Sequence, residues 1–553
     1  MNRSNAPLAT AWDAIIVGAG PVGLMLANLL GVHGVRTLVI ERNAKLEAEP
    51  RAVTIDDESL RTCQQAGLID TVMKDIVPGY GVQYFDWRGK PFASIQPTRE
   101  EYGYPKRNAF RQPLFVAALL EGLGRFNHVD VRFGHTLLDV VQPGDPARPA
   151  HCTLGREGGS TVGVDAGWVV GCDGARSRLR EIAGSALDGS TLPQRWLIVD
   201  LAQRRLALRD TRTFCDPRRP AIRLPGPHGT LRYEFMLRAG DVDDAVLDER
   251  IWRQWLADRM PEDADLPLVR KAVYGFHARV ANRWKQGRIL LAGDAAHLTP
   301  PFAGQGVNSG IRDAANLAWK IAAVTRWGFD ASLIDSYEPE RKPHAAALIR
   351  MAMRIGDFMQ PASIPGAMLA QTALRLACLV PWCRDYILQL RFKPKPHFAE
   401  GWFERSTGAT HSQLVPQPFV QHPVKGRVLL DTLIGDGFVV IGWDSPAFLA
   451  AALGLLPAGM PGRALALIRR GDDFLGPEPQ TRDGEPAIER IRDPGGTLDA
   501  LLDARSAAAL VIRPDRYTWR FASSADLETL AATAPVAAPS SSILQQEILG
   551  APG

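Results

Sequence analysis

The sequence predicts an α/β protein in which a parallel sheet carries inserted β-rich segments and is followed by a separate C-terminal region. An uninterrupted apolar strand at 14–17 is followed by a glycine turn, a helix at about 21–33 and a second strand at 37–40. Such a strand is expected in a parallel sheet that is covered on both faces. The stretches at about 77–107 and 190–282 change to short segments rich in turn residues, which indicate β-structure.

The composition is that of a globular protein, and the length suggests about three domains, or two with large insertions. The chain has 553 residues, of which 46% are hydrophobic and 22% charged, and its formal net charge is +4. This nearly balanced charge does not indicate binding to nucleic acid or to an anionic membrane. Six scattered cysteines form no CxxC pair and no zinc-like spacing. We therefore expect reduced thiols, a cytoplasmic location and no bound metal.

Residues 14–32 contain no charged side chain, so this segment could be a membrane span or the core of a signal peptide. Three glycines interrupt it, and neither a Lys/Arg-rich lead nor a clear cleavage site accompanies it. A buried strand, turn and helix explain the segment better. We therefore expect no membrane span here.

The turn after the first strand carries the pattern GxGxxG at 18–23. Gly18 permits the tight turn, Gly20 lets the backbone approach a pyrophosphate, and Gly23 allows the helix to pack closely on the sheet. The N-terminus of the helix offers free N–H groups to phosphates. Glu41 closes the second strand, where a carboxylate can accept hydrogen bonds from a ribose. The pattern in this context predicts a Rossmann-like dinucleotide site, without distinguishing FAD from NAD.

Two later segments are more specific. The segment 171–180, GCDGARSRLR, matches GxDGxxSxxR, and the segment 293–310 matches GDAAH followed by PxxGxGxN. Together with the N-terminal glycines, these motifs resemble the single-component, group A flavoprotein aromatic hydroxylases, whose best-known type is para-hydroxybenzoate hydroxylase. The resemblance implies FAD as cofactor and NADH or NADPH as reductant. It also implies that a flavin C4a-hydroperoxide transfers oxygen to a phenolic ring.

The resemblance implies a set of residues around the cofactor. Asp294 would bind a ribityl hydroxyl, and a helix beginning near Gly306 would direct its N-terminal amides at the flavin. Arg51 and Gln112 match family positions near the phosphates and the flavin. The predicted cofactor-binding residues are Gly18, Gly20, Pro21, Val22, Gly23, Glu41, Arg42, Arg51, Gln112, Asp173, Asp294, Pro301, Gly304, Gly306, Val307 and Asn308.

The implied fold is a Rossmann-like FAD-binding domain of the glutathione-reductase type, as in the para-hydroxybenzoate hydroxylase fold, with an inserted β-sheet substrate domain. We predict the FAD-binding domain at 10–76, 107–188 and 283–400, and the substrate domain at 77–106 and 189–282. The region 410–548 resembles the thioredoxin-like C-terminal domain of the phenol hydroxylase branch. No cysteine follows Cys383, so this domain cannot perform dithiol chemistry. We expect it to serve packing or oligomerisation.

Within the group, the chain is most similar to the 3-(3-hydroxyphenyl)propionate hydroxylases. The segments that carry this similarity are CDPRRP at 215–220, LPGP at 224–227, RYEFML at 232–237 and YGFHARV at 274–280. The similarity implies a small phenolic substrate, O₂ as co-substrate and a role in aromatic catabolism. Homodimers are common in the resembled group.

Four residues are candidates for contact with the substrate. His277 or Tyr274 could draw a proton from the phenol, and their spacing of three predicts that only one of them faces inward. Arg223 and Arg232 could bind a substrate carboxylate, because a guanidinium can donate two parallel hydrogen bonds to a carboxylate. For each of these residues a purely structural role remains an alternative.

Three other functions remain open at this point. The first is hydroxylation of another phenol, such as resorcinol, a hydroxybenzoate or a polyketide. The second is a flavoprotein oxidase, dehydrogenase or halogenase on the same scaffold, although the WxWxIP segment of the halogenases is missing. A non-catalytic FAD-binding module is the third, and it fits poorly because all three flavin motifs are intact.

Overall fold

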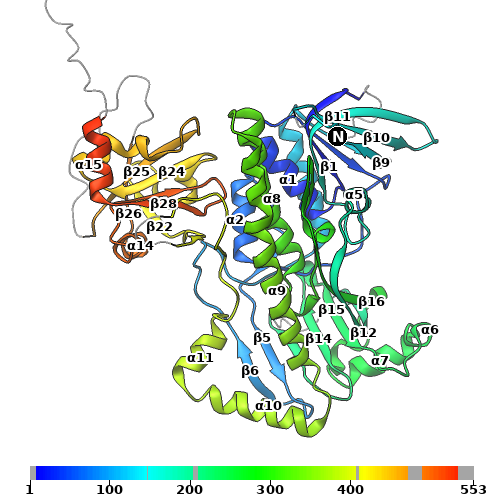
Figure 1. The fold of residues 1–553 in the computed structure, drawn as a ribbon. Helices are drawn as coiled ribbons and strands as arrows, with labels where there is room; N and C mark the ends of the chain where they lie inside the picture. The colour runs from blue at the N-terminus through cyan, green and yellow to red at the C-terminus, as the bar shows by residue number, and fades with distance from the viewer. Residues whose placement is uncertain (1–7, 146, 204–208, 406–409, 471–487, 534–553) are drawn as a thin grey trace, which may run out of the picture.

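The structure is a computed structural model that describes residues 8–145, 147–203, 209–405, 410–470 and 488–533. The predicted C-terminal domain beyond residue 533 lies outside this description. Two sheets lie on one side of the long helices, and the C-terminal domain lies on the other side of these helices (Figure 1).

The first sheet is the predicted parallel sheet. Its order is β17-β18-β11-β1-β2-β8, and β1 (Ala11–Val17) pairs in parallel with β2 (Thr37–Glu41) and β11 (Thr161–Gly171). The remaining strands of this sheet are β8 (Val129–Phe133), β9 (His135–Val141), β10 (Ala150–Arg156), β17 (Lys285–Gln286) and β18 (Ile289–Leu291). The carboxyl ends of β1, β11 and β18 therefore meet at one edge, where all three motifs begin.

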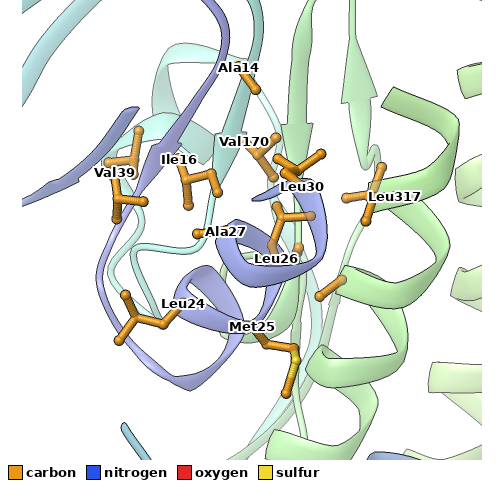
Figure 2. Packing of buried hydrophobic residues seen from close by; sticks show 14 of the residues in the cluster. Ala14, Ile16, Leu24, Met25, Leu26, Ala27, Leu30, Val39, Val170 and Leu317 are labelled. Atoms are coloured by element: carbon orange, nitrogen blue, oxygen red, sulfur yellow. The ribbon is translucent and has the colours of Figure 1, made fainter. Parts of the chain in front are cut away.

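Helix α1 (Pro21–Val32) packs between this sheet and the long helix α8 (Gly306–Arg326). Figure 2 shows Leu26 and Leu30 of α1 close to Val170 of the sheet and Leu317 of α8. The apolar sequence of α1 is thus explained by burial on two sides inside the protein. The other elements around this sheet are α2 (Asp57–Gln65), α3 (Ile69–Met73), α4 (Gln112–Gly122), α5 (Arg178–Ile182) and a small sheet of β3 (Thr54–Ile55), β7 (Asn108–Phe110) and β4 (Ile76–Pro78).

The second sheet has eight strands in the order β19-β16-β12-β15-β14-β13-β5-β6. Its strands are β5 (Val82–Phe85), β6 (Pro91–Ile95), β12 (Leu187–Leu201), β13 (Thr211–Phe214), β14 (Ala221–Pro225), β15 (Leu231–Met236), β16 (Leu268–Ala281) and β19 (His297–Leu298). Segments that are distant in sequence thus share one sheet. The domain division that we propose places these strands in the substrate domain, except β19 and the first two residues of β12, which fall in the segments assigned to the FAD-binding domain. The helices α6 (Asp243–Val246) and α7 (Glu249–Ala257) follow β15, and Trp252 of α7 packs against the core on the sheet's outer face.

Helix α9 (Tyr337–Met359) runs beside α8 and leads to the hairpin of α10 (Ile364–Ala377) and α11 (Pro381–Leu388), which contacts β6 (Figure 1). Among the described helices, none is by itself long and apolar enough to cross a membrane. The helices α10 and α11 pass that test only as a pair, and they are bent by 111°.

The C-terminal domain is built on a third sheet, in the order β23-β22-β26-β25-β24-β27-β28. Strand β24 (Phe438–Trp443) is parallel to β25 (Gly462–Ile468) and antiparallel to β27 (Ala509–Ile512), which continues into β28 (Thr518–Ala522). This order, with helices after β24 and β28, is that of a thioredoxin-like fold. The remaining elements are β20 (His397–Phe398), β21 (Ser412–Gln413), β22 (Phe419–His422), β23 (Gly426–Leu429), α12 (Asp431–Ile434), α13 (Pro446–Ala451), β26 (Glu489–Arg492), α14 (Thr497–Asp503) and α15 (Ser524–Thr533).

Buried ion pairs join the C-terminal domain to α8 and α9. Glu340 of α9 accepts hydrogen bonds from Arg513 at 2.8 Å and from Lys320 of α8 at 2.7 Å, and all three side chains are fully buried. A second buried pair links Arg61 of α2 to Asp431 at 2.7 Å. The C-terminal domain is therefore held by charges that have been removed from water, and each needs its partner.

Candidate active site

One cavity of about 440 Å³ runs from the glycine turn of the first sheet to the face of the second sheet. Its volume lies within the range of ligand sites. At one end it is lined by the motif residues of the first sheet, and at the other by side chains of β5, β13, β14 and β15. The cavity thus connects the predicted cofactor site with the predicted substrate domain.

The glycine turn has the geometry that the motif requires. Gly18 has a φ of 108°, and a Cβ added there would lie 2.5 Å from the carbonyl oxygen of Cys172. A Cβ at Gly20 would have no protein atom within 4 Å, so the backbone is open toward the cavity. A Cβ at Gly23 would lie 2.0 Å from the carbonyl oxygen of Gly18. The first two residues shape the ligand surface, whereas Gly23 permits close packing behind it.

Two helix N-termini face the cavity. Pro21 and Val22 at the start of α1 line it, and so do Gly306 and Val307 at the start of α8. Neither helix has a side-chain cap or an acidic residue in its first turn. Their free N–H groups and positive dipole ends are therefore available to anionic groups of a ligand.

Carboxylates line the same end of the cavity. Glu41 accepts hydrogen bonds from the backbone N–H groups of Ala19 at 3.0 Å and Asn43 at 2.9 Å, which fix it at the mouth of the glycine turn. Asp173 accepts one from the N–H of Leu179 at 3.1 Å, and its second oxygen is buried without a partner. Such an orphaned acceptor at a cavity wall is satisfied when a ligand hydroxyl or amide binds.

Asp294 opens onto the cavity but is enclosed by protein on its other sides, where the 293–297 turn meets α8. This enclosure raises the pKa of its carboxyl, and the nearby His297 and Arg51 partly offset the effect. The turn is fixed by Asp313, which accepts hydrogen bonds from the N–H of Gly293 at 3.0 Å and from His297 at 2.8 Å.

Gln112 fixes the segment on the opposite wall of this end. Its side-chain oxygen accepts a hydrogen bond from the N–H of Ala52 at 2.8 Å, and Gln112, Ala52 and Arg51 all line the cavity. The lining also includes Arg42, Pro301 and Gly304.

The other end of the cavity is one face of the second sheet. Cross-strand pairing places Tyr84, Thr213, Ile222 and Glu234 next to one another in a row across β5, β13, β14 and β15. All four line the cavity, because residues opposite one another in a sheet share a face. Phe302, just before α8, lies against the same end. Burial raises the pKa of the Tyr84 hydroxyl to about 12, so this group is a hydrogen-bond donor at neutral pH.

Comparisons with known proteins agree with this geometry. The family described as FAD binding domain matches residues 11–352, and the HcaD C-terminal domain matches residues 412–536. A 3-(3-hydroxy-phenyl)propionate/3-hydroxycinnamic acid hydroxylase of Mycolicibacterium smegmatis is 39% identical over 93% of this chain and 90% of its own. A protein of the same name from Escherichia coli is 37% identical over 91% of this chain and 90% of its own.

This chain belongs to the FAD-dependent aromatic hydroxylases. The fold agrees: the flavin-dependent monooxygenase PieE, solved with FAD and substrate, has a TM-score of 0.76 and is 21% identical over 95% of this chain and 98% of its own. FAD is the cofactor of the hydroxylase and a reduced nicotinamide its reductant. The cavity fits FAD, because it offers two uncapped helix N-termini, an open backbone at Gly20 and the unpaired Asp173 oxygen.

Two of the predicted cofactor-binding residues, Gly23 and Asn308, do not line the cavity and support its structure instead. Gly23 lies behind the turn, as described above. Asn308 is fully buried and outside the cavity lining, and its amide bonds to the backbone of Asp56 at 3.0 Å and to Ser59 at 2.7 Å. It ties α8 to α2 and so positions the N-terminus of α8.

The structure does not bring His277 or Tyr274 to the cavity lining. His277 bonds through Nδ1 to the hydroxyl of Thr191 at 2.9 Å on the neighbouring strand. The hydroxyl of Tyr274 bonds to Glu49 at 3.1 Å and to Arg270. The spacing of Tyr274 and His277 along β16 places their side chains on opposite faces of the strand, as expected. Both side chains, however, already form hydrogen bonds with other residues of the protein.

The two arginines predicted to bind a carboxylate are also occupied. Arg223 is fully buried on the opposite face of the second sheet, where it pairs with Asp263 at 2.8 Å. Arg232 is on the cavity side, but it pairs with Asp200 at 2.6 Å and donates to the carbonyl of Arg51 at 2.8 Å. It therefore holds the segment that carries Arg51. The prediction assumed that each arginine is free to bind a ligand, but inside the fold each one pairs with a carboxylate.

The residues that line the cavity at the second sheet were not predicted from the sequence; they are Tyr84, Arg107, Thr211, Thr213, Ile222, Leu224, Glu234 and Phe302. One signal was available: Arg232 and Glu234 are charged residues in the buried strand LRYEFM, where a charge requires a reason. The pairing of β5 with β13 could not be read from the sequence, because more than a hundred residues separate these strands.

Proposed function

We propose that the hydroxylase uses FAD, O₂ and NADH or NADPH to hydroxylate 3-(3-hydroxyphenyl)propionate or a closely related phenol. The observation that carries this proposal is the single cavity that joins the FAD end to the face of the second sheet. The names of relatives that match over nine-tenths of both chains support the substrate. FAD supplies hydride acceptance and activation of O₂; the chain supplies position, charge and exclusion of water.

Different residues along the cavity bind different parts of FAD and the substrate. We propose that the N-terminus of α1 and Gly20 bind the pyrophosphate, that Glu41 binds a ribose and that Asp294 binds the ribityl chain. The N-terminus of α8 then faces the part of the flavin that becomes negative on reduction, and the helix dipole stabilises that charge. Apolar side chains on the second sheet exclude water from the ring to be hydroxylated.

The visible spectrum of the purified protein, followed by NADH and NADPH oxidation with and without 3-(3-hydroxyphenyl)propionate, tests this proposal. We expect flavin absorption, faster reductant and O₂ consumption with the substrate, and a catechol product. Stimulation without a hydroxylated product would reject this phenol as the substrate. Absence of flavin even after FAD is added would contradict the whole proposal.

We also infer a homodimer and a cytoplasmic location. All six cysteines are free, which suits a reducing compartment. Apolar side chains are exposed on α10, α11 and the turn between them, among them Leu369 at 75%, Leu379 at 76% and Trp382 at 67%. Several exposed apolar side chains in one helical hairpin are typical of a protein interface, and a second copy of the chain is the partner that we infer.

A further inference from the structure

The substrate-facing end of the cavity carries two opposite charges that the cofactor site does not use. Glu234 is 6% exposed, and within the described residues no hydrogen bond or ion pair reaches its carboxylate. Arg107 lies over the ring of Tyr80 at 5.0 Å, its Nη2 donates to the Tyr80 hydroxyl at 3.5 Å, and its Nε is buried without an acceptor. No carboxylate in the described part of the chain pairs with it. A ligand of matching polarity would satisfy both groups.

The two charges lie toward different ends of the row on the second sheet. Glu234 and Tyr84 are separated by Thr213 and Ile222, a distance of roughly 14 Å at the usual strand spacing. Arg107 is near the Tyr84 end, since its carbonyl accepts a hydrogen bond at 3.3 Å from the N–H of Tyr80, just before β5. The wall therefore has a proton-accepting end, a partly apolar middle and a cationic end.

We propose that Glu234 accepts the proton of the substrate's ring hydroxyl while Arg107 binds the substrate's carboxylate at the other end. This inference rests on the proposed function. The phenolic O–H bond breaks, its proton goes to a carboxylate oxygen of Glu234, and the electron pair stays on the phenolate oxygen. The phenolate enriches the ring carbons ortho and para to it in electrons, which prepares them for an electrophilic oxygen.

The surroundings of Glu234 suit a proton acceptor at neutral pH. Burial raises the pKa of its carboxyl to about 7, the charge of Arg232 opposes the rise, and Asp200 adds to it. Arg232 and Asp200 are bonded to each other, and the direct neighbours of Glu234 on β14 and β12 are Ile222 and Ile198. Arg107 is at the far end of the row, and the other charged groups of the wall belong to the cofactor end. With this pKa the carboxyl is about half ionised at pH 7 and becomes mostly ionised as the pH rises above it.

The first test is Glu234→Gln in the FAD-loaded enzyme. We expect product formation to fall about 100-fold or more, the usual contribution of a general base, with FAD content unchanged. In the unmodified enzyme kcat/KM should rise with pH through about 7, and the variant should lose this rise. Glu249→Gln, on an exposed helix of the same domain, is the matched control. Unchanged turnover and an unchanged pH profile would overturn the role of Glu234.

The second test compares two phenols in Arg107→Gln. With 3-(3-hydroxyphenyl)propionate we expect KM to rise roughly 10- to 100-fold, the loss of one charge-assisted contact. With 3-propylphenol, which has no carboxylate, KM should stay within about two-fold, because that contact is never made. Arg250→Gln, an exposed substitution, is the control. Equal changes for both phenols, or none, would overturn the role of Arg107.

The outcomes separate this inference from the proposed function. If the unmodified enzyme hydroxylates neither phenol, the proposed function fails and this inference with it. If it hydroxylates them and both variants behave like the unmodified enzyme, only the assignment of Glu234 and Arg107 fails. If Glu234→Gln loses FAD, the role of Glu234 is judged from the pH profile of the unmodified enzyme, and the role of Arg107 from the comparison of the two phenols.

Discussion

Single residues around the cavity differ in how their polar atoms are paired. Arg223 and Arg232 each pair with a carboxylate, whereas among the described residues no hydrogen bond or ion pair reaches the Glu234 carboxylate, and the Nε of Arg107 and one oxygen of Asp173 are buried without a partner. An unpaired buried polar atom is costly, and because these three residues line the cavity, a bound ligand would supply the missing partners.

Asp294 allows a test at the scale of one residue. Asp294→Ala should weaken FAD binding about 10- to 100-fold, because a hydrogen bond to a charged group contributes roughly 1.5–3 kcal/mol. Equilibrium dialysis of FAD against the purified protein measures this change. Asp335→Ala, which removes an exposed carboxylate paired with Lys285, is the control. If the variant retained FAD with unchanged affinity, Asp294 would not belong to the site.

At the scale of elements, local patterns predicted the site's framework well and its substrate wall poorly. The strand, glycine turn and helix at 11–32 are in place, because the apolar run and the Gly18 turn allow little else. The sequence predicted short β-segments over about 190–282, but which face of the strand 231–236 lines the cavity depends on its pairing with β14 and β12. That pairing is decided by tertiary packing, and a shift of one residue would exchange the two faces.

The α10–α11 hairpin carries a prediction at the same scale. If its exposed apolar side chains form the dimer interface, Leu379→Asp combined with Trp382→Ser should convert the dimer to a monomer, because charge and polarity enter an apolar contact. Light scattering coupled to size-exclusion chromatography measures the mass. Exposed Val424→Asp, in the C-terminal domain, is the control. A dimer in the double variant, or a monomer before any substitution, would reject this interface.

The whole molecule depends on a buried ionic contact between its domains. Burial alone would raise the pKa of Glu340, but the charges of Arg513 and Lys320 outweigh it and hold that pKa at about 2. A carboxyl with a lowered pKa stabilises the folded state above its unfolded value, near 4.3, and this stability is lost as the pH falls toward 2. The domain contact is therefore expected to weaken in acid.

Glu340→Gln tests this contact. It should destabilise the protein by about 3–5 kcal/mol at pH 7, because Arg513 and Lys320 are left buried without their shared partner. The difference in free energy of unfolding between the two proteins should shrink as the pH falls below about 4.3, because protonation of Glu340 then removes the same ion pairs from the unmodified protein. Urea unfolding at several pH values measures both effects. A cost that is independent of pH would show that the charge of Glu340 is not what matters.

Whether one cavity brings a phenol to FAD for oxygen transfer can be decided from the mass of the product. The purified enzyme would be given FAD, NADH or NADPH, 3-(3-hydroxyphenyl)propionate and isotopically labelled O₂. We predict a dihydroxylated product that contains one labelled oxygen atom, with the second atom of O₂ released as water. A product without label, or consumption of O₂ to hydrogen peroxide with the phenol unchanged, would contradict it.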